Sequence, residues 1–275
     1  MKKILLIISV LFSFASIRGQ ELDIYWQDVD FNDTTLIGSK QLSDKMVDFL
    51  YQYSCCDESS FDSLSIKGTE IILGKAKTNM RMYEFVLEYL LNGYSNMGKS
   101  QVVDYLLTYP QLFEGEISME EGLRLDSITE PYQLVKVGAQ APDFTGFTID
   151  GKTYRLYDSK ANNIIVVFWS TDCEYCHDFL LQIRKHLNLK SDYELVTFAL
   201  ADSQEEVTQA VKKMRLQGYH FYDPLRWESR PFLDYHITST PTVFLLDKEK
   251  NIVCKPYDWL ELKLYIEKNN KLINK

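Results

Sequence analysis

Residues 164–183 read IIVVFWSTDCEYCHDFLLQI, and this stretch decides the fold of the chain. Its first six residues form an unbroken apolar run that is too short for a helix of ordinary length, so we expect a strand buried on both faces. Phe179, Leu180 and Ile183 then recur at helical spacing, which predicts an amphipathic helix directly after the strand. Two cysteines, Cys173 and Cys176, lie at this junction between strand and helix.

Cys173 stands at the start of the predicted helix, where unpaired N–H groups and a partial positive charge stabilise a thiolate. We therefore expect Cys173 to ionise more readily than a free cysteine and to act as the nucleophile. Cys176 lies one turn further on, within reach for a disulfide, and would resolve the exchange. Glu174 opposes the thiolate from the same turn, so Cys173 should be only moderately acidified and the pair should act as a reductant.

The segment from Trp169 to Cys176 resembles the Trp-x-x-x-Cys-x-x-Cys active site of thioredoxin-like proteins, and of the TlpA/ResA branch in particular. Members of that branch are membrane-anchored or periplasmic thiol–disulfide oxidoreductases. The resemblance covers residues 138–275. It implies an α/β thioredoxin-like domain, in which a central mixed sheet has flanking helices, and a redox-active disulfide without any further cofactor.

A second segment, Thr240-Pro241 followed by a β-prone run, matches the proline that is cis and faces the dithiol in thioredoxin-like folds. A cis bond would turn the backbone of Thr240 outward, where it could pair with an extended substrate strand. An ordinary trans proline at a strand entrance is the alternative. We expect Trp169 to pack beside the dithiol and Tyr175 to be exposed toward the partner. The predicted substrate-binding residues are Trp169, Glu174, Tyr175, Thr240 and Pro241.

The chain departs from the family pattern at two positions. Many thioredoxins carry a buried acid on the strand before the dithiol, where this chain has Val167. In ResA-like proteins an acid after the following strand is thought to carry a proton. Asp202 is the loosest match to that acid, and it becomes our candidate general base for Cys176.

The N-terminus predicts export. Lys2 and Lys3 precede an apolar run and then small residues, so residues 1–20 read as a signal peptide, with an uncleaved anchor as the alternative. Cleavage would remove Lys2, Lys3 and Arg18 and no acid, which moves the formal charge from −9 to −12. So acidic a protein is poorly suited to nucleic acid or anionic membrane surfaces. We expect a periplasmic protein with no membrane span after cleavage and, since no cysteine lies near the cleavage point, no lipid anchor.

Residues 21–135 predict a helical domain, to which we assign no activity. Apolar stripes occur around residues 42–53, 82–90 and 102–107. Thr78 and Gly93 have the positions of an N-cap and a C-terminal stop for the second stripe, and Ser118 and Glu121 have capping-box spacing for a fourth helix. The adjacent Cys55 and Cys56 read as two unrelated thiols or as a strained, labile disulfide.

Residues 136–275 form the predicted thioredoxin-like domain. Asp150-Gly151 predicts a hairpin between residues 144–149 and 153–157. Further strands are expected at 194–200, 219–223, 242–246 and 252–254, and helices at 203–217, closed by Gly218, at 231–235 and after Trp259. The order strand, helix, strand, helix implies a parallel core.

Other functions of the Cys-x-x-Cys motif stay open. Cys173 to His177 also spells the Cys-x-x-Cys-His motif of covalent haem attachment, which would give a red protein. A zinc site needs two more ligands than the chain offers at suitable spacing, so we expect no metal. A thiol peroxidase of the AhpC/TSA kind is the nearest functional neighbour. The peroxiredoxin pattern, however, needs proline at position 166 and threonine at position 170, where this chain has Val166 and Ser170. A permanent structural disulfide in a binding module is the remaining alternative.

The sequence therefore predicts an exported protein-disulfide oxidoreductase. Its expected partners are disulfide-containing exported proteins and a membrane or periplasmic thiol donor, not nucleic acid. The sequence gives neither the substrate nor a role for Cys254.

Overall fold

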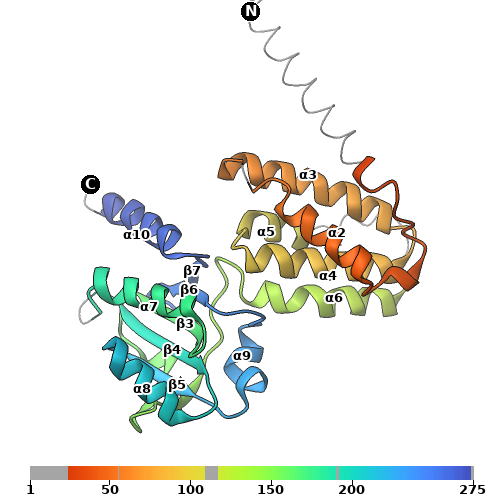
Figure 1. Ribbon diagram of the computed structural model, residues 1–275. Helices are drawn as coiled ribbons and strands as arrows, with labels where there is room; N and C mark the ends of the chain where they lie inside the picture. The colour runs from red at the N-terminus through yellow and green to blue at the C-terminus, as the bar shows by residue number, and fades with distance from the viewer. Residues whose placement is uncertain (1–23, 55, 109–116, 190–191, 274–275) are drawn as a thin grey trace, which may run out of the picture. The chain divides into compact units, whose positions relative to one another are not determined.

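The computed structural model describes residues 24–54, 56–108, 117–189 and 192–273 (Figure 1). The predicted signal peptide and Cys55 lie outside these ranges. The chain forms two compact units: one takes in the residues up to Ser95 and Gln101–Thr129, and the other takes in Asn96–Ser100 and Glu130–Lys275. In the part of the chain that is described, no helix is long and apolar enough to cross a membrane.

The N-terminal region is helical, as predicted. Its elements are the 3-10 helix η1 (Thr34–Leu36) and the helices α2 (Lys40–Tyr51), α3 (Glu58–Ala76), α4 (Met80–Asn96), α5 (Ser100–Thr108) and α6 (Met119–Leu134). The predicted stripes of α2 and α5 are buried. Ser118 and Glu121 form the predicted capping box, because Ser118 Oγ accepts from the Glu121 amide and the Glu121 carboxylate accepts from the Ser118 amide.

Helix α3 was not predicted, and its composition explains why. The face that it buries includes Ser65 and Thr69, both fully buried, alongside Ile72 and Leu73. Because small polar residues take core positions, the apolar period that marks the other helices is broken here. Asp57 caps the helix by accepting from the Ser60 amide at 3.1 Å.

Both predicted ends of α4 were wrong. The helix begins at Met80, and Asn79 rather than Thr78 accepts from the amides of Arg81 and Met82. At its other end the helix runs through Gly93 to Asn96. A Cβ on Gly93 would lie 2.4 Å from Leu50 Cδ1, so this glycine allows a side chain of α2 to approach α4 closely.

A five-stranded mixed sheet lies at the centre of the second unit, which confirms the thioredoxin-like fold class. Its strands, in spatial order, are β5 (Tyr219–Tyr222), β4 (Glu194–Leu200), β3 (Ile164–Ser170), β6 (Thr242–Leu246) and β7 (Ile252–Cys254). Strands β3, β4 and β5 run parallel, whereas β6 is antiparallel to both of its neighbours. The predicted hairpin forms a separate pair, β1 (Thr145–Phe147) and β2 (Thr153–Arg155).

Strand β3 is buried on both faces, as its apolar run predicted. Its alternation directs Ile165, Val167 and Trp169 to one face, which α7 (Glu174–His186), α8 (Gln204–Met214) and α10 (Trp259–Ile273) cover (Figure 1). The other face of β3 packs with α9 (Arg230–Asp234) and the β1–β2 hairpin. Because β3, β4 and β5 are parallel, the segments that follow them leave one edge of the sheet, and β6 begins at that same edge.

Gly218 does not end α8, contrary to the prediction. The helix stops at Met214, and Arg215 forms its C-cap in a left-handed conformation with φ of 52°. Gly218 lies instead where β5 begins beside β4, and a Cβ there would be 2.2 Å from the Leu195 carbonyl oxygen. The glycine is therefore required by close backbone approach within the sheet.

Candidate active site

The two cysteines of the motif meet at the start of α7. Cys173 is the N-cap of the helix, and its Sγ accepts a hydrogen bond from the Cys176 amide at 3.1 Å. The two residues form a disulfide, with Cα atoms 5.2 Å apart. Cys173 is half-buried, whereas Cys176 is fully buried. A partner can therefore reach the first sulfur but not the second.

Thr240 and Pro241 lie opposite the dithiol. The peptide bond between them is cis, as the family resemblance implied. The Thr240 carbonyl oxygen is 3.8 Å from Cys173 Sγ, although 67 positions separate the two residues in the chain. The sheet brings them together, because β6 starts at Thr242 and Thr242 pairs with Phe168 near the end of β3.

Trp169 is fully buried and belongs to the same hydrophobic cluster as both cysteines. Its ring and that of His177 meet edge to face with centroids 5.7 Å apart. Within the described ranges, neither Trp169 Nε1 nor His177 Nε2 has a hydrogen-bond partner, and both atoms are buried. The two rings are thus packed together, and Trp169 lies in the cluster that includes Cys176 and against which Cys173 packs.

Glu174 and Tyr175, which separate the two cysteines, both point to solvent. The Tyr175 side chain is 76% exposed, which is unusual for a large aromatic residue. Both side chains are available to a bound partner.

Asp202, the candidate base for Cys176, follows β4 and is exposed. The carboxylate is 85% exposed and forms an ion pair with Arg226 at 2.7 Å, whereas Cys176 is fully buried. A second acid, Glu206 in the first turn of α8, contacts the loop before Cys173. Thr171 Oγ1 donates to the Glu206 carboxylate, whose second oxygen accepts from the Asp202 amide at 3.1 Å.

The contact between Thr171 and Glu206 was missed at the sequence level. Ser203 and Glu206 have capping-box spacing, and the Glu206 amide donates to Ser203 Oγ at 3.2 Å. That spacing carries no information about a partner 35 positions away.

Cys254 takes no part in the site. It is buried on β7, and burial raises the pKa of its thiol to about 12, with a further contribution from the Glu261 carboxylate. Among the described residues, no group of three or more His, Cys, Asp or Glu side chains could hold a metal ion.

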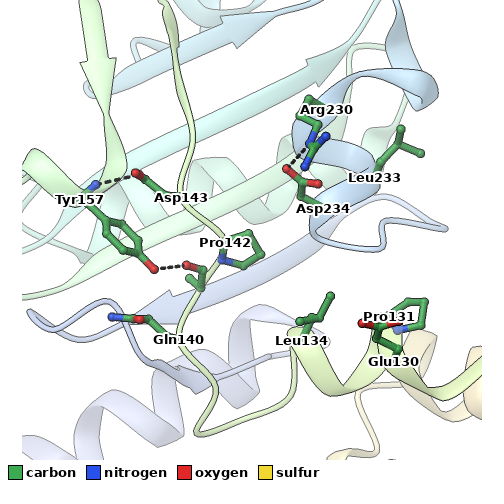
Figure 2. A pocket seen from close by; sticks show the side chains of 11 residues that line it. Glu130, Pro131, Leu134, Gln140, Pro142, Asp143, Tyr157, Arg230, Leu233 and Asp234 are labelled. Carbon is green, nitrogen blue, oxygen red and sulfur yellow. Dashed lines mark hydrogen bonds and ion pairs between the residues drawn. The ribbon is translucent and has the colours of Figure 1, made fainter. Parts of the chain in front are cut away.

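A separate hollow of about 620 Å³ lies in the second unit and is shown in Figure 2. Several of its polar groups are paired with protein atoms. Tyr157 donates through its hydroxyl to the Ala141 carbonyl and through its amide to Asp143, and Arg230 pairs with Asp234. We assign no chemistry to this hollow.

The second unit is similar in sequence to known thioredoxin-like proteins. Residues 137–255 match the model of the AhpC/TSA family. The thioredoxin-like protein YneN of Bacillus subtilis is 27% identical over 122 residues, which are 43% of this chain and 69% of the relative. The thiol-disulfide oxidoreductase ResA of Bacillus cereus is 26% identical over 123 residues, which are 44% and 69% of the two chains. A solved thioredoxin-like protein from Bacteroides caccae has a TM-score of 0.58 and 16% identity, over 90% of this chain and 92% of its own.

The fold and the dithiol therefore define a thioredoxin-like protein. The relatives confirm the resemblance to the TlpA/ResA-like family and the assignment as a protein-disulfide oxidoreductase.

Proposed function

We propose that this protein exchanges disulfides with exported proteins through Cys173 and Cys176, and that it acts as their reductant. The supporting observation is the unequal burial of the pair: Cys173 is half-buried at the helix N-cap, and Cys176 is fully buried behind it. A helix start favours the thiolate form of Cys173. The Thr240 carbonyl opposite Cys173 gives an extended substrate a backbone group with which to pair.

The exchange takes two steps. The Cys173 thiolate attacks one sulfur of the substrate disulfide, a mixed disulfide forms, and the other substrate sulfur leaves as a thiolate. Cys176 then loses its proton and attacks Cys173, which releases the second substrate sulfur and closes the Cys173–Cys176 disulfide. The substrate gains two electrons and the protein loses two. An external thiol donor must return two electrons before the next cycle.

The proposed direction of electron transfer rests on the charge of Glu174, and the proposed location rests on the N-terminal sequence. Glu174 in the first turn of α7 disfavours the Cys173 thiolate, which suits a reductant better than a strong oxidant. The N-terminal sequence, with Lys2 and Lys3 ahead of an apolar run, supports export to a periplasmic space. A measured reduction potential at the oxidising end of the thioredoxin-like range would reject the reductant role.

The proton of Cys176 needs an acceptor, and Asp202 is the acid that the family resemblance implies. The variant Asp202→Asn tests this role through the rate at which Cys176 attacks the mixed disulfide at Cys173. An unchanged rate excludes Asp202 as the base, and the ion pair with Arg226 favours that outcome.

Trapping of the mixed disulfide tests the proposed function. Cys176→Ser should hold the substrate on Cys173, where mass spectrometry can identify it, whereas Cys173→Ser should trap nothing. Cys254→Ser is the matched control, because Cys254 is buried and its thiol has a raised pKa. If the Cys176 variant keeps full activity, the proposed order of attack is wrong.

A thiol peroxidase is the second candidate, because the matched family is AhpC/TSA. The chain has Val166 and Ser170 where the peroxiredoxin pattern has proline and threonine, which weakens this candidate. Consumption of hydrogen peroxide by the reduced protein at a rate above its disulfide exchange would favour it. Attachment of haem would need thioether bonds at both cysteines, and the complete burial of Cys176 disfavours that chemistry.

A further inference from the structure

The edge of the sheet that carries the dithiol also carries the connections that follow β4 and β5, beside the start of β6. Residues 171–178 follow β3, residues 201–206 follow β4, and residues 223–229 follow β5. The connections are tied to one another. The Thr171 amide donates to the Leu200 carbonyl at 3.1 Å, and Arg226 pairs with Asp202 at 2.7 Å. A substrate polypeptide that reaches Cys173 therefore approaches the edge of the sheet at which all three connections lie.

These three connections are strongly acidic. Asp172 and Glu174 flank Cys173 directly, and Asp178 lies one turn further along α7; all three are exposed. The sequence adds acids on the neighbouring connections, and the one Lys or Arg within the three ranges is Arg226, which pairs with Asp202. The remaining acids are Asp202, Glu205, Glu206, Asp223 and Glu228. Such a field attracts cationic polypeptides and repels anionic ones.

Large apolar side chains are exposed on the same connections. Leu225 is 60% exposed and Trp227 is 43% exposed, in addition to Tyr175. Arg226, between them, has a φ of 53°, a conformation that is costly for a residue with a side chain. The ion pair with Asp202 holds this turn, and Trp227 packs edge to face on Phe232 with centroids 5.6 Å apart. The turn is thus fixed with two apolar side chains facing solvent, as in a surface that binds a partner.

We propose that this edge of the sheet selects the substrate of the protein. The preferred substrate is a polypeptide disulfide in which basic residues and a large apolar residue lie beside the cysteine. The inference rests on the proposed function. The dithiol is the site, and the carboxylates around it favour one class of disulfide over another. Leu225 and Trp227 supply the contact that an apolar residue of the substrate would bury.

A single-turnover experiment with the pre-reduced full chain tests this substrate class. Three cyclic peptide disulfides, identical except for flanking lysine, glutamate or glutamine, are compared with the small uncharged disulfide of 2-mercaptoethanol. The lysine peptide should react about tenfold faster than the glutamate peptide at low ionic strength. High salt should bring the two rate constants together, because it screens exposed charges.

Matched pairs of variants test whether the acids beside Cys173 cause the difference in rate between the lysine and glutamate peptides. Asp172→Asn together with Asp178→Asn should reduce the ratio of the lysine to the glutamate rate. Asp158→Asn together with Glu249→Gln removes two exposed acids at the opposite edge of the sheet and should leave that ratio unchanged. Trp227→Ala should slow a peptide with a tryptophan beside its cysteine about tenfold relative to one with glycine there.

The outcomes separate the two proposals. Equal rates for the three peptides, or a faster glutamate peptide, would overturn the substrate class, while turnover of the uncharged disulfide would leave the proposed function standing. Failure of the reduced protein to react with every disulfide would instead overturn the proposed function and the inference with it.

Discussion

Thr171 Oγ1 donates a hydrogen bond to the carboxylate of Glu206, and this contact joins the loop before Cys173 to the first turn of α8. The other carboxylate oxygen accepts from the Asp202 amide, so Glu206 uses both oxygens to hold backbone and side chain near the dithiol. A hydrogen bond to an ionised carboxylate is stronger than one between neutral groups.

Thr171→Val removes the hydroxyl but keeps the shape of the side chain. The free energy of unfolding should fall by about 1.5–3 kcal/mol, because the half-buried carboxylate loses a donor. Thr171→Ser restores the hydroxyl and should recover most of that loss. Denaturant unfolding of the oxidised proteins measures both. Equal stability of the valine variant and the parent would show that this hydrogen bond does not hold the loop.

Alkylation should distinguish the three cysteines of the second unit. After mild reduction, Cys173 should react first with iodoacetamide because it is half-buried and lies at a helix start. Cys176 and Cys254 should react slowly in the folded protein, the first because it is fully buried and the second because it is buried with a pKa of about 12. Peptide mapping by mass spectrometry gives the order. Slow alkylation of Cys173 would favour a structural disulfide.

The dithiol and its opposite proline could be predicted because each is encoded in one continuous run. Residues 164–183 contain both the buried strand and the amphipathic helix, so the junction that carries Cys173 follows from local pattern alone. Thr240-Pro241 directly precedes strand β6 and could be placed in the same way.

Contacts between distant segments could not be predicted. Glu206 lies within the helix predicted from residue 203, but its partner Thr171 is 35 positions away. The partner of Arg226, Asp202, is 24 positions away. The roles of two glycines also depend on distant segments and could not be predicted. Gly93 and Gly218 were interpreted as helix ends because of their local position, whereas both serve close approach by another segment, Leu50 in one case and Leu195 in the other.

Substitution of Gly218 tests that close approach. In Gly218→Ala the new Cβ would lie 2.2 Å from the Leu195 carbonyl oxygen, and the backbone of a central strand cannot move aside cheaply. We expect a loss of about 1–3 kcal/mol or more in the free energy of unfolding. Gly74→Ala in helix α3 is the control, because nothing lies within 4 Å of its Cβ, and it should gain about 0.5–1 kcal/mol from helix propensity. Similar effects of the two substitutions would contradict the close approach.

His220 should make the stability of the second unit depend on pH. The ring is buried on β5 with Nδ1 2.9 Å from Thr197 Oγ1, and burial lowers its pKa from 6.5 to about 4. In the unfolded chain His220 binds a proton below pH 6.5, whereas in the folded protein it stays neutral to about pH 4. Stability is therefore lost as the pH falls through this window, by up to about 3 kcal/mol from this residue.

The variant His220→Gln keeps a polar side chain beside Thr197 and removes the titration. Denaturant unfolding at a series of pH values should give a flatter curve for the variant than for the parent between pH 6.5 and about 4. Carboxylates that titrate in the same range act on both proteins, so the difference between the two curves isolates the histidine. Parallel curves would mean that His220 titrates alike in the folded and unfolded chains, which its burial among the strands of the sheet argues against.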